Sequence, residues 1–183
     1  RAGRLTRHTS EGTARMEHIW APWRLAYVTG GDQRPDDACF LCAARDGTDD
    51  AATLVIARAK RCFAILNRYP YNAGHLMIVP NDHLPGIENL SATTLTAMMT
   101  LAQRCLGALR TTMAPEGYNM GINQGKVAGA GLADHVHYHI VPRWNGDTNF
   151  MPTLGHVKVI PELLDDTWRK LHAALEADAG GKR

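Results

Sequence analysis

Three histidines alternate with apolar residues in one short run of the sequence, HVHYHIVPR at residues 135–143. Because side chains alternate across a β-strand, His135, His137 and His139 would point to one face, about 6.6 Å apart at a rise of roughly 3.3 Å per residue. A buried imidazole has two ring nitrogens that need partners, so three on one face are an unusual way to fill a core. The run therefore predicts a chemical site.

Two chemistries suit this row of imidazoles. Either all three histidines bind one metal ion, or one imidazole is a nucleophile whose tautomer is set by a hydrogen bond to its other nitrogen. The outer two positions lie about 13 Å apart along a regular strand, which is too far for one ion with metal–nitrogen bonds of about 2.0 Å. The second chemistry also explains the GKVAGAG run at residues 125–131, whose backbone N–H groups can bind a phosphate. The residues thus favour a nucleophilic histidine beside a bound phosphate.

Three segments together resemble the signature of the histidine-triad (HIT) family. They are HVHYHIVPRW, GHLMIVPNDH at residues 74–83 and YNMGINQG at residues 118–125, and the resemblance covers roughly residues 18–177. The flanking sequences PRWNGDTNFM and NRYPYNAGH are typical of the family's bacterial diadenosine tetraphosphate phosphorylases and hydrolases. The resemblance implies a nucleotidyl hydrolase or transferase that cleaves diadenosine polyphosphates, with phosphate or water as acceptor.

The resemblance also implies the catalytic roles. It makes the central His137 the nucleophile that attacks the α-phosphorus and forms a nucleotidyl-histidine intermediate. It makes His139 a stabiliser of the strand and the phosphate loop, and His75 a hydrogen-bond partner within the cluster.

The substrate-binding residues follow from the same resemblance. Asn67 stands where the family often has an acidic residue that contacts the ribose hydroxyls, and Asn123 matches an asparagine on the phosphate side. Trp144 has the position of an aromatic ring that stacks on adenine, although simple packing explains it equally well. Many relatives have Gln or Ser where this chain has Gly131. Either backbone N–H groups from Gly129 to Gly131 replace that side chain, or turnover is slower and the leaving group is chosen differently.

Cys39 and Cys42 form a CxxC pair, CFLC, without the strand–helix context of a redox motif. In zinc-bearing relatives two N-terminal cysteines are joined by a histidine at the position of His83 and by the first triad histidine, here His135. The resemblance therefore implies a closed Cys2His2 zinc site that ties an N-terminal loop to the active-site strand, the alternative being a pair of free thiols. Mg²⁺ bound to the substrate polyphosphate is a further expectation, although no carboxylate cluster is evident for it.

The hydrophobic pattern predicts an α+β scaffold for these residues. Strands are expected at residues 53–57, 61–67, 75–80, 118–122 and 135–143, and helices at residues 91–113 and 161–177. Met98 and Met99 are expected in the core stripe of the first helix, and Cys62 and Cys105 are expected to be buried. The CFLC pair is expected on a loop or knuckle rather than inside a long regular element. The resemblance implies a five-stranded antiparallel sheet with two helices, paired as a homodimer through one continuous sheet.

Length and composition indicate one domain: 183 residues, of which 45% are hydrophobic and 21% charged. We expect a tail at residues 1–15, interpreted as a cloning remnant, an upstream extension before Met16 or a weak transit-like peptide. Residues 16–183 would form a single HIT domain with a catalytic core at about 53–145, preceded by an aromatic arm at 18–28.

The net charge of +2 is concentrated in the tail, whose four arginines and one glutamate give +3 and leave −1 for the rest. This balance argues against a nucleic-acid partner. No apolar run approaches the roughly 18 to 20 residues of a membrane span, so we expect a cytoplasmic protein without a membrane partner. Two other functions stay open: a nucleoside phosphoramidate or adenylate hydrolase, and a zinc-stabilised nucleotide-binding module without turnover.

Overall fold

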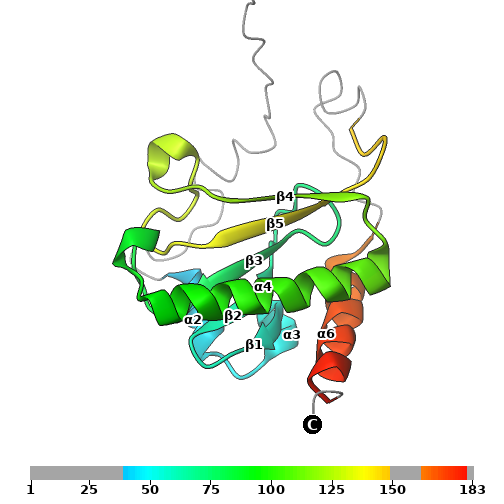
Figure 1. Ribbon diagram of the computed structural model, residues 1–183, viewed down its shortest axis with the longest axis horizontal. Coiled ribbons are helices and arrows are strands. Elements are labelled where there is room, and N and C mark those ends of the chain that lie inside the picture. The colour runs from blue at the N-terminus through cyan, green and yellow to red at the C-terminus, as the bar shows by residue number, and fades with distance from the viewer. Residues whose placement is uncertain (1–38, 149–161, 181–183) are drawn as a thin grey trace, which may run out of the picture.

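The computed structural model describes residues 39–148 and 162–180, and five strands of this part form one sheet (Figure 1). The strand order is β1-β2-β3-β5-β4, and every neighbouring pair is antiparallel. The strands are β1 (Val55–Arg58), β2 (Cys62–Leu66), β3 (Leu76–Pro80), β4 (Gly117–Ile122) and β5 (Tyr138–Arg143). The α+β class and the five-stranded antiparallel sheet are thereby confirmed, whereas the predicted tail and the arm at 18–28 lie outside the described residues.

Helix α4 (Ala92–Met113) crosses one face of the sheet (Figure 1). The Ser91 side chain caps it by accepting a hydrogen bond from the Thr94 amide at 3.1 Å. Met98 is buried as predicted, but Met99 is 43% exposed. Successive helical residues are rotated by about 100°, so both methionines cannot point into one narrow contact with the sheet.

Helix α6 (Leu164–Gly180) packs on α4 and β1. It extends beyond the predicted end at Ala177, and Pro161 lies outside the described residues. The indole of Trp168 donates a hydrogen bond to the Val55 carbonyl at 2.7 Å, and His172 Nδ1 lies 3.0 Å from the Ile56 carbonyl. These contacts cover the outer strand β1.

Two short helices, α2 (Phe40–Asp46) and α3 (Asp50–Thr53), precede the sheet, and two 3-10 turns, η1 (Ile87–Asn89) and η2 (Lys126–Ala128), lie in later loops. The CFLC pair therefore lies at the start of a short helix: it is not on a loop, but it is also not inside a long regular element, as predicted. Cys39 is the N-cap of α2 and Cys42 lies in its first turn, where its amide donates to the Cys39 sulfur at 3.4 Å. The predicted strand at 53–57 starts later, at Val55, because α3 occupies the preceding residues.

Strand β5 is shorter than predicted, since His135 to His137 precede it. The Val136 amide donates to the Leu84 carbonyl at 2.8 Å rather than to a partner within the sheet ladder. The ring of His137 bonds back to the carbonyl of His135, which favours a bent backbone at this point. The three histidines are consequently not a regular row on one strand.

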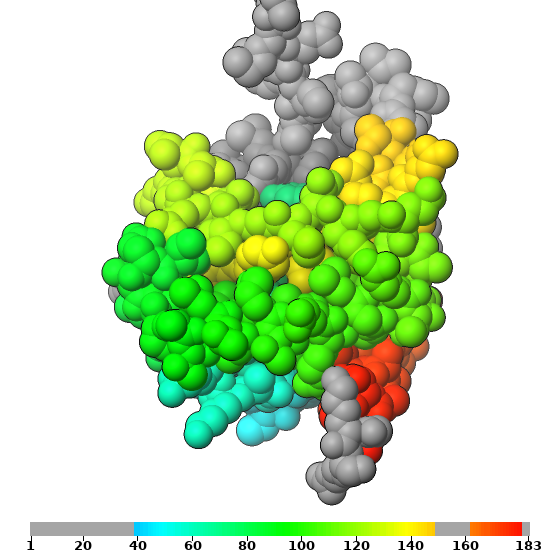
Figure 2. All heavy atoms as spheres, in the orientation of Figure 1, coloured from blue at the N-terminus to red at the C-terminus, as the bar shows by residue number. Residues whose placement is uncertain are grey.

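The core lies between the sheet and helices α4 and α6, and Figure 2 shows the face on which α4 and β4 leave only a narrow part of β5 visible. Cys62 and Cys105 are fully buried, as predicted. Burial raises the pKa of the Cys62 thiol to about 11 and that of Cys105 to about 12. Within the described residues, none of the helices combines the length and apolar character needed to cross a membrane.

Candidate functional site

The structure brings the three predicted catalytic histidines together. His75 Nε2 lies 3.0 Å from His139 Nδ1, and the ring centroids of His137 and His139 are 4.8 Å apart. His75 follows Gly74, whose φ is +74° and whose added Cβ would lie 2.8 Å from the Met113 sulfur. Glycine therefore allows the chain to pass close to the end of α4 and to enter β3 with His75 facing the cluster.

One backbone carbonyl fixes the tautomer of His137. Its Nδ1 lies 2.8 Å from the His135 carbonyl oxygen, which can only accept a hydrogen bond. Nδ1 must therefore carry the proton, which leaves the lone pair on Nε2. Burial lowers the pKa of His137, a residue only 6% exposed, so the ring is neutral at pH 7. A neutral imidazole with a free lone pair is the form that acts as a nucleophile.

A chain of hydrogen bonds fixes the rings of His75 and His139. The Tyr71 amide donates to His75 Nδ1 at 3.1 Å, so the proton of a neutral His75 is on Nε2. Nε2 of His75 then donates to His139 Nδ1. The proton of a neutral His139 is accordingly on Nε2, which is a hydrogen-bond donor beside His137.

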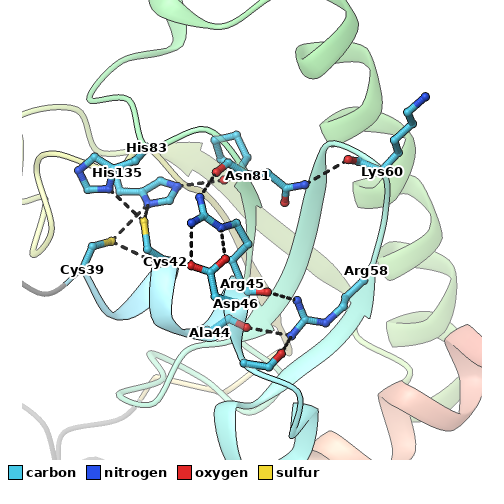
Figure 3. A network of polar contacts seen from close by, with 12 residues as sticks. Cys39, Cys42, Ala44, Arg45, Asp46, Arg58, Lys60, Asn81, His83 and His135 are labelled. Atoms are coloured by element: carbon cyan, nitrogen blue, oxygen red, sulfur yellow. Dashed lines mark hydrogen bonds and ion pairs between the residues drawn. The ribbon is translucent and has the colours of Figure 1, made fainter.

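The four predicted metal ligands also converge (Figure 3). The donor atoms of Cys39, Cys42, His83 and His135 all lie within 4.8 Å of one another, and this is the one such group among the described residues. Cys42 Sγ lies 3.2 Å from His83 Nδ1, while Cys39 Sγ lies 3.3 Å from His135 Nδ1. Zn–S bonds of about 2.3 Å and Zn–N bonds of about 2.0 Å at a tetrahedral angle require a sulfur–nitrogen distance of about 3.5 Å. The residues therefore fit a tetrahedral zinc ion.

The tautomer of His135 is the reverse of that of His137. His135 Nε2 donates to the Pro80 carbonyl at 2.9 Å, so Nδ1 carries the lone pair and faces the two sulfurs. Burial lowers the pKa of His135, which is fully buried, and the neutral ring is the form that binds a metal. Without an ion, burial and the adjacent Cys39 raise the pKa of the Cys42 thiol.

Two predicted substrate-binding residues lie in turns that follow strands. Asn67 follows β2, and its side-chain oxygen accepts a hydrogen bond from the Tyr69 amide at 2.9 Å. Trp144 follows β5 and is half-buried, with its amide donating to Asp147 at 3.1 Å. These turn contacts use the side-chain oxygen of Asn67 and the backbone amide of Trp144. The groups to be tested for substrate binding are therefore the side-chain nitrogen of Asn67 and the face of the Trp144 ring.

The other predicted substrate-binding residues lie in the glycine-rich segment between β4 and β5. Asn123 is half-buried directly after β4, and Gly131 is exposed. The Gly129 amide donates to the Lys126 carbonyl at 3.0 Å and the Ala130 amide to the Gly125 carbonyl at 3.3 Å. In this conformation both amides are engaged within the turn, so phosphate binding by the 129–131 backbone stays a prediction.

The contacts of the Asp147 carboxylate were not predicted from the sequence. This carboxylate accepts hydrogen bonds from Asn72 Nδ2 at 2.7 Å, from Arg143 Nε at 2.6 Å and from the Trp144 amide. The Arg143 guanidinium holds the pKa of this carboxyl well below its ordinary value. The Asn–Gly–Asp turn after β5 was its only signal in the sequence.

Gln124 was missed as well. Its amide nitrogen donates to the Glu88 carboxylate at 2.9 Å, and its oxygen accepts from the Ile87 amide at 3.1 Å. These two bonds tie the start of the glycine-rich segment to η1. A glutamine in a loop has no distinctive pattern in one sequence.

The chain is similar to several known proteins. The family model described as the HIT domain matches residues 48–146. An AP-4-A phosphorylase from Mycobacterium tuberculosis is 38% identical over 161 residues, which are 85% of this chain and 83% of the relative. An adenosine 5′-monophosphoramidase from Schizosaccharomyces pombe is 29% identical over 108 residues, 59% of this chain and 76% of the relative.

A solved structure gives the same match in three dimensions. A Zn-bound histidine triad family protein from Mycobacterium smegmatis has a TM-score of 0.64 and 27% identity, covering 79% of this chain and 98% of its own. The shared architecture extends over nearly all of that protein.

Proposed function

The chain belongs to the HIT domain family as one of its enzymes, and we propose that it cleaves diadenosine polyphosphates such as diadenosine tetraphosphate through a nucleotidyl-histidine intermediate on His137. The observation that carries this proposal is the hydrogen bond from His137 Nδ1 to the His135 carbonyl at 2.8 Å. It leaves Nε2 of a buried, neutral ring as the nucleophile. The similarity to an AP-4-A phosphorylase indicates the substrate class.

In the first step, the His137 Nε2 lone pair attacks an α-phosphorus of diadenosine tetraphosphate. The N–P bond forms as the P–O bond to the remaining chain breaks, and ATP leaves with the electron pair of that bond. In the second step, phosphate attacks the same phosphorus, the N–P bond breaks, and ADP is released; water as the acceptor gives AMP. The ring ends in its starting tautomer, because Nδ1 keeps its proton on the His135 carbonyl.

His139 and His75 support this step from one side. The Nε2–H of His139 is a donor next to His137, so it can hydrogen-bond an oxygen of the reacting phosphate and stabilise its developing charge. His75 keeps His139 in that tautomer. Asn67 and Asn123 are proposed to contact the ribose and the phosphates, Gly129 and Gly131 to let the chain approach the phosphates closely, and Trp144 to stack on adenine.

We also propose structural zinc at Cys39, Cys42, His83 and His135. Zinc bound here would hold both sulfurs as thiolates and join α2 to the segment before β5. The donor distances and the tautomer of His135 support it, as does the similarity to a Zn-bound relative. The described residues offer no support for the expected Mg²⁺. Pairing of two copies through one continuous sheet also stays a prediction.

A second candidate function is hydrolysis of nucleoside phosphoramidates or adenylates. It is favoured by the similarity to an adenosine 5′-monophosphoramidase. The same histidine would attack the same α-phosphorus, and only the leaving group would differ.

Product analysis tests the proposal. Diadenosine tetraphosphate is incubated with the protein, with and without phosphate, beside His137→Asn. We expect ADP and ATP with phosphate present; AMP and ATP without it would indicate a hydrolase. If neither pair exceeds the His137→Asn background, the dinucleotide assignment fails. Release of AMP from adenosine 5′-phosphoramidate would then establish the second candidate, and nucleotide binding without any product would establish a binding module.

A further inference from the structure

Helix α2 supplies half of the metal ligands, although it is only seven residues long. A helix of this length is not stable alone, because most short helices in water need tertiary contacts. Its N-terminal end meets His83 and His135 through the two cysteine sulfurs. What holds its other end decides whether the sulfurs face the histidines before any ion binds.

Arg58 at the end of β1 holds the C-terminal end of α2 (Figure 3). Its NH1 donates to the Arg45 carbonyl at 2.7 Å, and its NH2 donates to the Ala44 carbonyl at 2.8 Å. NH2 also lies 3.0 Å from the Gly47 carbonyl and 2.7 Å from a carboxylate oxygen of Asp50. One guanidinium thus satisfies three carbonyls at the end of the helix, where intrahelical partners run out.

Arg45 connects α2 to the backbone that directly follows β3. Its NH1 donates to the Asn81 carbonyl at 2.6 Å. Asn81 directly follows Pro80, whose carbonyl orients His135, and lies two residues before His83. One short stretch of backbone therefore positions both histidine ligands and receives α2.

We propose that Arg58, acting together with Arg45, is a positioning residue for the metal centre, holding α2 so that Cys39 and Cys42 face His83 and His135 before the ion binds. This inference rests on the proposed zinc site. The guanidinium of Arg58 contacts carbonyls of residues 44–47 and none of the donor atoms. It therefore acts on metal affinity only through the placement of the helix.

The test compares Arg58→Met with a matched control, Arg104→Met. Arg104 binds the end of α6 in the same way, through Asp178 at 2.9 Å and the Leu175 carbonyl at 3.0 Å, but it supports a different helix. Co²⁺ and Zn²⁺ affinities are measured by competition with a chelator, and the Co²⁺–thiolate absorption reports the ligand set. We expect Arg58→Met to bind about tenfold more weakly with an unchanged spectrum, and Arg104→Met to bind like the wild type. Equal affinities in Arg58→Met and Arg104→Met would overturn the inference.

Hydrogen exchange of the metal-free chain separates this inference from the zinc proposal. We expect the α2 amides to be protected in the wild type and in Arg104→Met, and to exchange freely in Arg58→Met. Protection that persists in Arg58→Met contradicts the role of Arg58, whereas a wild type without a thiolate band contradicts the zinc site. If Arg58→Met does not fold, Arg58→Lys replaces it, since one ammonium cannot span the same carbonyls and carboxylate. An affinity of Arg58→Lys equal to that of the wild type would also overturn the inference.

Discussion

His135 and His137 are two positions apart, and both are buried histidines, yet the structure prepares them for different chemistry. In His135 the Pro80 carbonyl engages Nε2, and Nδ1 faces two sulfurs. In His137 the His135 carbonyl engages Nδ1, and Nε2 keeps the lone pair. The backbone acceptor that each ring meets decides which nitrogen is left, and so whether the histidine is suited to be a ligand or a nucleophile.

The two sites also share one backbone segment. The residue whose ring faces the sulfurs supplies the carbonyl that fixes the tautomer of the proposed nucleophile, His137. A substitution of the His135 side chain removes a ligand but keeps that carbonyl. Side-chain variants can therefore separate the two roles.

The largest effect on cleavage is expected at the proposed nucleophile, His137. His137→Asn should reduce cleavage of diadenosine tetraphosphate by about 10⁴-fold or more, since no other group replaces Nε2. Its metal content should equal that of the wild type, because no donor atom is lost. Nucleotide products and bound metal are measured on the same preparation. Cleavage within about tenfold of the wild type would falsify the assignment of His137.

Loss of a proposed metal ligand should act mainly on metal binding. We expect His135→Asn to lower zinc affinity by about 10²- to 10³-fold, about a quarter of the roughly 10–16 kcal/mol typical of structural zinc. Cleavage should fall much less than in His137→Asn, since residue 135 keeps its carbonyl. Chelator competition and product assays measure the two effects, with His83→Asn as a control that loses an exposed ligand. Unchanged zinc affinity in both variants would remove these histidines from the site.

The next largest effect on catalysis is expected at His75, whose hydrogen bond sets the tautomer of His139. His75→Leu removes the donor to His139 Nδ1, and we expect a fall of about 10²-fold in kcat with little change in KM. His75→Gln can still donate from its side-chain amide and should recover part of that loss. Steady-state kinetics of His75→Leu and His75→Gln measure the loss in kcat and its recovery. If His75→Leu and His75→Gln show the same kcat, the hydrogen bond from His75 to His139 does not support the reaction.

The smallest of these effects is expected from a substitution of Asp147. Its carboxylate joins Asn72, in the loop before His75, to Arg143 at the end of β5. The Asp147 side chain is 11% exposed, and its charged hydrogen bonds should make Asp147→Asn about 1–2 kcal/mol less stable than the wild type. Urea unfolding measures the difference, with zinc affinity expected to stay unchanged.

The pH dependence of this difference has a definite sign. Arg143 lowers the folded pKa of Asp147 below its ordinary value of 3.8, so the carboxylate stabilises the fold fully above that value. The contribution is lost as the pH falls through the folded pKa. The stability gap between wild type and Asp147→Asn should therefore be constant from about pH 7 to pH 5 and narrow below about pH 4. A gap that widens on acidification would contradict the role of the Arg143 contact.

The sheet and the long helix could be predicted because their patterns are local. Alternating or continuous apolar runs indicated all five strands, and the spacing of Met98, Cys105 and Leu109 indicated α4. The four metal-ligand candidates came from a family resemblance, and the structure brings them together.

The features that the sequence did not predict depend on contacts between residues far apart in the chain. Helix α2 is too short to show a periodic pattern, and its end is held by Arg58, a residue of the next strand. The late start of β5 depends on the Leu84 carbonyl, which lies 52 positions before Val136 in the chain. The tautomers depend on backbone carbonyls at residues 80 and 135, which no residue type reveals.

The burial of Cys62 and Cys105 has a practical consequence for this chain, which has four cysteines in total. Their high pKa values leave almost no thiolate at neutral pH, so alkylating reagents reach them slowly in the folded protein. Cys39 and Cys42 are half-buried and are therefore the more accessible pair, although burial and the adjacent Cys39 raise the pKa of Cys42. Mass spectrometry of the alkylated native protein therefore reports whether the CFLC sulfurs hold a metal ion, because adducts form on Cys39 and Cys42 only when no ion is bound to them.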